Sequence, residues 1–152
     1  GHSVNIAATV KKFNGFLRVR IVSQSIQIPV SVGELFDKQT ILQIKCDRID
    51  DPAKRAHAVH ELELLTHRAD DMLAGCPIRA DIVALVAELH AVNAELWDLE
   101  NIVRACERAA RFDSDFVATA RRIYAGNDRR AAIKLRINTL LGSDIVEVKS
   151  HR

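Results

Sequence analysis

The sequence predicts an all-α protein, an antiparallel bundle of four to five helices with one long central helix and a small N-terminal β element. Three observations lead to this prediction. Apolar residues recur every three or four positions over 81–107, which is the spacing of one helix face. Residues that cap or end helices separate this stretch from its neighbours. The connections left between the expected helices are short, which favours antiparallel neighbours.

Two runs of alternating apolar residues precede the first expected helix, at 17–21 and 26–30. With 23–25 as the turn between them, they predict a β-hairpin. Pro29 has no N–H to donate, so the second strand is expected to be very short or to lie at an edge. Another extended pattern follows the last helix at 145–148, and we consider its pairing with 26–30.

The first two helices have clear start signals. Ser31 and Glu34 have the spacing of a capping box, so the first helix is predicted to span 32–49. Asp51 followed by Pro52 combines an N-cap with proline at the first helical position. The second helix is predicted to span 52–74, and Gly75 ends it.

The long central helix is predicted to span 79–110. Asp113 is then the N-cap of a fourth helix. Gly126 is either the end of that helix or a kink, and Asn127 is a candidate cap for a fifth helix over 128–141. Residues 26–150 are expected to form one helical domain, and 1–25 an N-terminal extension whose first residues resemble an expression-tag remnant.

Composition excludes several classes of protein. The 152 residues are typical of one domain. The net charge of +2 lacks the basic excess of nucleic-acid-binding proteins, so no nucleic acid is expected. No apolar run approaches the roughly 20 residues of a membrane helix, so no membrane is expected either. Cys46, Cys76 and Cys106 form no CxxC motif, which predicts reduced thiols and a cytoplasmic location.

A second stripe of the central helix starts apolar and then becomes polar. It begins at Val83 and Val86 and continues to Asn93, Trp97 and Glu100, one residue beyond the purely apolar core stripe. Because tryptophan is a poor surface residue, we expect this stripe to be covered. A buried Asn or Glu then needs a partner, since an unpaired polar group costs about 1–3 kcal/mol.

Other helices offer such partners on matching faces. The hypothesis is that Asn93, Trp97 and Glu100 meet Asp37 or Lys45 and Arg130 or Lys134 in the middle of the bundle. The cluster is either a network that fixes helix register or a pocket for a small polar or anionic ligand. An ordinary surface pair between Glu100 and Arg104 is the alternative for the end of the stripe. The candidate ligand-binding residues are Asp37, Lys45, Asn93, Trp97, Glu100, Asn127, Arg130 and Lys134.

The second helix carries a possible set of metal ligands, because His60, Glu63 and His67 share one of its faces. Imidazole and carboxylate groups suit zinc. However, a four-coordinate site needs more ligands than one helix can direct at an ion. We therefore predict no metal, no cofactor and exposed histidines. No residue is assigned a catalytic role.

Several stretches carry a family resemblance. The first stretches are IPVSVGEL at 28–35, DK at 37–38, TIL at 40–42, IK at 44–45 and DPAK at 51–54. The later ones are NAELWDLE at 93–100, NDRRAA at 127–132 with Lys134, and LGS at 141–143 with Glu147 and Lys149. Together they resemble an uncharacterised bacterial helical family, domain of unknown function family 6165, over about 26–150. The resemblance implies no established activity. Genes of that family often lie near those of surface-polysaccharide glycosyltransferases.

Three functions are compatible with these observations. The first is a ligand-binding helical domain linked to surface-polysaccharide or nucleotide-sugar metabolism. The second is an adaptor that forms a homodimer through the long helix. The third is a small all-helical enzyme acting on an anionic substrate, because the first helix slightly resembles that of helical chorismate mutases. A solvent-connected pocket favours the first or third function, and a dry network with an outer apolar stripe favours the adaptor.

Overall fold

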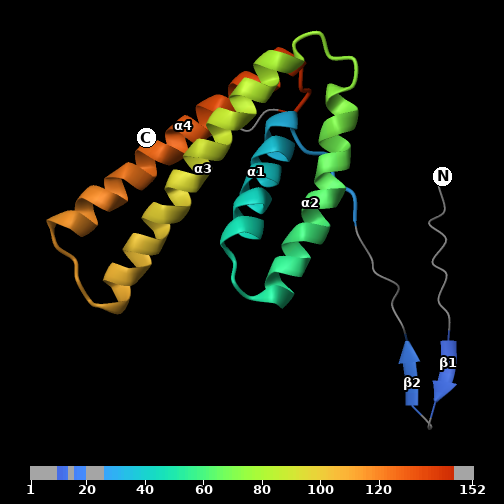
Figure 1. Ribbon diagram of the computed structural model, residues 1–152, viewed down its shortest axis with the longest axis horizontal. Coiled ribbons are helices and arrows are strands. Elements are labelled where there is room, and N and C mark those ends of the chain that lie inside the picture. The colour runs from blue at the N-terminus through green and yellow to red at the C-terminus, as the bar shows by residue number, and fades with distance from the viewer. Residues whose placement is uncertain (1–9, 14–15, 20–25, 146–152) are drawn as a thin grey trace.

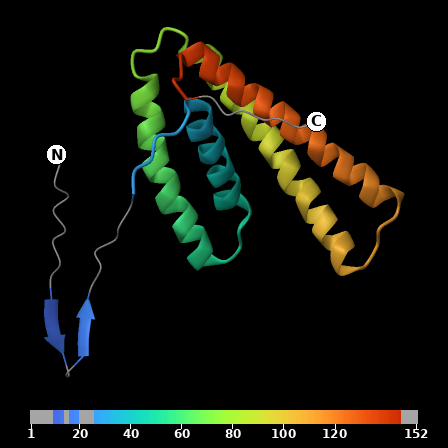
Figure 2. The same ribbon diagram turned by 180° about the vertical axis from the view of Figure 1, so that it is seen from behind.

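A computed structural model describes residues 10–13, 16–19 and 26–145 of the chain. The four helices of this part are α1 (Val32–Arg48), α2 (Pro52–Leu73), α3 (Arg79–Arg108) and α4 (Ser114–Leu141), so the predicted all-α bundle is confirmed. They form two antiparallel hairpins, α1–α2 and α3–α4, which meet at the end that carries the α2–α3 connection and diverge toward the other end (Figures 1 and 2). In the described ranges, every helix is too short or too polar to cross a membrane.

The predicted helix starts are confirmed by their caps. Ser31 Oγ accepts from the Glu34 N–H at 3.2 Å, and Asp51 Oδ1 accepts from the N–H of the second and third residues after it at 2.9 and 3.1 Å. Asp113 Oδ1 accepts from the Phe116 N–H at 3.1 Å. Each cap satisfies an N–H that the first turn of a helix leaves without an internal partner.

Gly126 does not end a helix, and the expected fifth helix is wrong. α4 continues through this position for 28 residues. A Cβ at Gly126 would lie 2.7 Å from Leu96 Cδ2, so the glycine allows α3 and α4 to approach closely. Asn127 is not a cap, because its Nδ2 donates to the Ile123 carbonyl at 3.1 Å inside the helix.

A two-stranded antiparallel sheet is present, with a different partner from the one predicted. β1 (Val10–Phe13) pairs with β2 (Phe16–Val19), with Val10 opposite Val19. The run predicted at 17–21 therefore overlaps β2, but 26–30 belongs to no strand, so the predicted pairing is wrong. Residues 20–25 and 146–148 lie outside the described residues. The 26–30 run forms no strand because Pro29 lacks the N–H that a paired strand needs. The strand β1 was not predicted because its two adjacent lysines interrupt the alternation of apolar and polar residues.

The main core lies where the hairpins meet. Phe36 of α1 packs there with Ile82 and Leu89 of α3, Ile137 of α4 and Leu73 of α2. These side chains come from the ends of the helices that converge in Figure 1. The core therefore fixes the end of the bundle at which the two hairpins meet.

Candidate functional site

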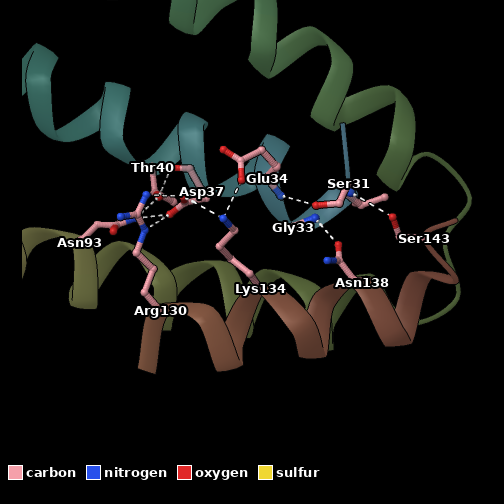
Figure 3. Close-up of polar contacts among 11 residues, drawn as sticks. Ser31, Gly33, Glu34, Asp37, Thr40, Asn93, Arg130, Lys134, Asn138 and Ser143 are labelled. Atoms are coloured by element: carbon pink, nitrogen blue, oxygen red, sulfur yellow. Dashed lines mark hydrogen bonds and ion pairs between the residues drawn. The ribbon is translucent and has the colours of Figure 1, made fainter. Parts of the chain in front are cut away.

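The first turn of α1 is attached to the C-terminal end of α4. The Gly33 N–H donates to Asn138 Oδ1 at 2.6 Å, and the Val32 N–H donates to Ser143 Oγ at 3.4 Å. A Cβ on Gly33 would lie 2.6 Å from the Lys134 carbonyl oxygen, so only glycine permits this backbone approach. The contact places the next turn of α1, which carries Asp37, directly over α4 (Figure 3).

Asp37 is the centre of a buried polar network, with only 1% of its surface exposed. Arg130 donates from Nε to Oδ1 at 2.8 Å and from Nη2 to Oδ2 at 2.5 Å. Asn93 of α3 donates from Nδ2 to Oδ1 at 2.9 Å. The planar guanidinium matches the two carboxylate oxygens, which is the strongest geometry for such a pair. One carboxylate therefore joins α1, α3 and α4 (Figure 3).

The orientation of the Asn93 amide follows from its two acceptors. Thr40 Oγ1 donates to the Asp37 carbonyl at 2.9 Å, so it can accept from Asn93 Nδ2, which lies 2.9 Å away. The other acceptor is the Asp37 carboxylate. Both amide hydrogens of Asn93 are thus used within the network.

The network keeps Asp37 ionised. Burial alone would raise the pKa of this carboxyl group, because a charge is disfavoured away from water. Hydrogen bonds from Arg130 and Asn93, with the positive charges of Arg130 and Lys134, outweigh burial and lower the pKa of Asp37 below its usual value. At neutral pH the site therefore contains a carboxylate.

A second ion pair extends the network toward the start of α1. Lys134, 8% exposed at its side chain, lies 2.6 Å from Glu34 Oε2 and 3.5 Å from Asp37 Oδ2. Glu34 was expected only as part of a capping box, and its carboxylate instead reaches α4. Two carboxylates one turn apart on α1 thus face two cations four residues apart on α4.

A pocket of about 390 Å³ lies beside this network, bounded by α1, α3 and α4. Its volume falls in the range of small-molecule sites, roughly 300–1,000 Å³. Trp97, the only tryptophan of the chain, is half-buried in its wall. The lining residues are Ile41, Ile44, Asn93, Leu96, Trp97, Glu100, Asn101, Arg104, Asn127 and Arg130.

Glu100 was expected to meet a cation of another helix, and this expectation is wrong. Glu100 is exposed, and its Oε2 lies 3.7 Å from Nη2 of Arg104, one turn further along α3. The ordinary i, i+4 surface pair therefore describes this end of the stripe. The cations expected for Glu100, Arg130 and Lys134, are paired with carboxylates of α1 instead.

Seven of the eight candidate residues fall into two connected groups. The buried network contains Asp37, Asn93, Arg130 and Lys134. The pocket is lined by Trp97, Glu100 and Asn127, and it shares Asn93 and Arg130 with the network. Lys45 is half-buried and does not line the pocket.

Sequence reasoning missed Glu34, Thr40 and Asn101. Glu34 precedes Asp37 by one turn, and Asn101 follows Trp97 by one turn, so helical spacing could have indicated both. Thr40 had no such signal, because a threonine inside a helix usually bonds only to the preceding turn.

The α2 histidines contribute nothing to this site. His60 and His67 are exposed as expected, and His67 Nδ1 lies 3.2 Å from Asp71 of the same helix. Among the residues whose positions are described, no three His, Cys, Asp or Glu side chains form a group that could hold a metal ion. The absence of a metal from the protein remains a prediction.

Comparisons of the chain with protein-family models, with curated proteins and with solved structures found no match. The resemblance to domain of unknown function family 6165 therefore remains a prediction, and the site is interpreted from its own geometry.

Proposed function

We propose that the pocket between α1, α3 and α4 binds a small polar or anionic ligand. The observation that carries the proposal is the combination, around one pocket, of Trp97 with the side chains of Asn93, Asn101 and Asn127. Pockets that bind small molecules typically combine an apolar wall with a few fixed polar groups.

The polar groups of the pocket wall are held in place before any ligand arrives. Asn93 and Arg130 each bond to the buried carboxylate of Asp37. A rigid wall lowers the entropy that binding costs, because fewer side chains must be ordered. The buried network therefore supports a binding role rather than competing with it.

The lining suits a ligand with one apolar face and several hydroxyl or acidic groups. Trp97, Ile41 and Leu96 supply apolar surface. The indole N–H and the amides supply hydrogen bonds, while Arg104 and Glu100 add one charge of each sign. A sugar or a nucleotide-sugar has this chemistry, which supports a role in surface-polysaccharide or nucleotide-sugar metabolism. The three cysteines, free of disulfides, support a cytoplasmic location.

Fluorescence of the single tryptophan tests the proposal directly, since Trp97 lies in the pocket wall. The protein is titrated with glucose, UDP-glucose, UDP and inorganic phosphate. We expect a saturable change in emission with at least one of these probes.

Matched variants then locate the response. Arg104→Gln should weaken binding of the active probe, and Arg108→Gln, the same change at an exposed position outside the pocket lining, should not. Absence of a saturable change with every probe, or equal effects of the two variants, would contradict the proposal.

A further inference from the structure

The outer face of α4 carries a regular stripe of exposed side chains. Gly126 faces α3, where it packs on Leu96. Val117 lies nine residues before Gly126, and Leu135 lies nine residues after it. At roughly 100° per residue, nine residues make about two and a half turns, so both residues lie on the side of the helix opposite Gly126. Both side chains are exposed, and so is Tyr124, the only tyrosine of the chain, at 70%.

The spacing of this face is that of a helix-pairing seam. Its positions follow one another at intervals of four and three residues, which is the heptad spacing of packed helices. We call these residues the outer stripe: Val117, Arg121, Tyr124, Asp128, Ala131 and Leu135. α4 forms an edge of the bundle in Figures 1 and 2, so the stripe points away from α3.

The outer stripe carries two charged residues. Arg121 and Asp128 are exposed, and neither takes part in any ion pair among the described parts of the chain. By contrast, the neighbouring Arg122 and Arg129 both bind Glu95 of α3. The outer stripe thus offers one charge of each sign without an ion-pair partner among the described residues, with Asp128 two residues after Gly126 and Arg121 five residues before it.

We propose that the outer stripe is a self-association surface, on which α4 of a second copy packs antiparallel. In a two-fold arrangement centred at the level of Gly126, Val117 of each copy lies opposite Leu135 of the other. Asp128 of each copy then lies at the level of Tyr124 of the other, one turn from Arg121, so the long arginine side chain can pair with Asp128 across the interface twice. A parallel arrangement would instead place like charges at the same level.

This inference is independent of the proposed ligand pocket and differs from the dimer predicted through the long helix. One face of α3 packs against α4 and α1, whereas the outer stripe lies on α4 and is exposed except at the half-buried Ala131. The stripe spans 19 residues, or about 27 Å between its ends. An interface of this length is small, so the dimer is expected to be weak and to form at high protein concentration.

Charge reversal with rescue tests the proposal by sedimentation analysis of the full chain up to about 1 mM, a range suited to a small interface. Arg121→Glu and Asp128→Arg each place like charges opposite each other in the dimer. Each should raise the dissociation constant by at least about tenfold, because like charges across an interface strongly suppress association. The double swap Arg121→Glu with Asp128→Arg should restore dimerisation.

Two further variants make the result decisive. Arg136→Glu, the same change at an exposed α4 position outside the outer stripe, should leave the dissociation constant unchanged. Tyr124→Ser removes apolar contact without changing charge and should also weaken the dimer. A monomeric wild-type protein at the highest concentration, a double swap that fails to restore association, or an equal effect of Arg136→Glu would overturn the proposal.

Discussion

Arg130 of α4 donates two hydrogen bonds to the two carboxylate oxygens of Asp37 of α1, across 93 residues of chain. The same carboxylate accepts from Asn93 of α3. One buried charge therefore links three helices, and two of its partners also line the pocket. Stability and pocket geometry are consequently coupled through Asp37.

Replacing Asp37 with asparagine should destabilise the fold strongly. The substitution leaves Arg130 and Lys134 without the carboxylate they share, and breaking a buried ion pair from one side costs about 3 kcal/mol. Urea unfolding measures the loss in unfolding free energy. Asp47→Asn, the same change at an exposed position of α1, should alter that free energy by less than about 0.5 kcal/mol. Similar values for the two variants would contradict the assignment.

The contribution of Asp37 should disappear in acid. Its pKa is lower in the folded protein than in the unfolded chain, where it is about 3.9. The stabilisation is therefore complete above the unfolded pKa and is lost as the pH falls through the folded pKa. Unfolding free energies of the wild type and Asp37→Asn should differ by a constant amount above about pH 5 and converge at lower pH. A difference that persists unchanged to pH 2 would refute this.

Two glycine substitutions should differ in their effect although both place a methyl group between helices. Gly33→Ala meets the Lys134 backbone carbonyl at 2.6 Å and should cost about 2 kcal/mol, because the backbone cannot move aside. Gly126→Ala meets the end of the Leu96 side chain, which can rotate. Both glycines lie in helices, so the roughly 1 kcal/mol by which alanine favours a helix applies to both, and the two variants differ in what the added methyl group meets. Thermal unfolding should therefore rank Gly33→Ala well below Gly126→Ala.

Glu100→Gln should leave the stability unchanged within about 0.5 kcal/mol, since exposed i, i+4 pairs contribute little. Glu88→Gln, on the exposed surface of the same helix, is the matched control. A loss above about 1 kcal/mol for Glu100→Gln alone would show that the residue has a buried partner, as the sequence had suggested.

The sequence predicted the helix starts well because each depends on local chemistry. Ser31, Asp51 and Asp113 accept from N–H groups two or three residues away, so their spacing is visible in the chain. Gly126 was misread because a glycine that ends a helix and one that admits a neighbouring helix look the same in sequence. Only the distance to Leu96 distinguishes them.

The helix faces of the candidate site were predicted correctly, but its partners only in part: Asn93 contacts Asp37 as expected, whereas Glu100 pairs with Arg104 of its own helix. Helical spacing placed Asn93 and Trp97 together, and Arg130 with Lys134, on the correct sides of their helices. Spacing cannot say which carboxylate a cation meets when several lie within reach. Glu34 and Asp37 are brought against α4 by the contact between Gly33 and Asn138, a relation between distant parts of the chain that no local pattern encodes.

The attachment of α1 to α4 also bears on how the protein is made. The groups that complete the first turn of α1, Asn138 and Ser143, lie 105 and 111 residues further along the chain. During translation, the α1–α2 hairpin therefore emerges from the ribosome long before Asn138 and Ser143 have been synthesised. The helical domain should acquire its native structure in one late step after α4 emerges, and nascent chains that stop short of Asn138 should be sensitive to proteolysis within α1.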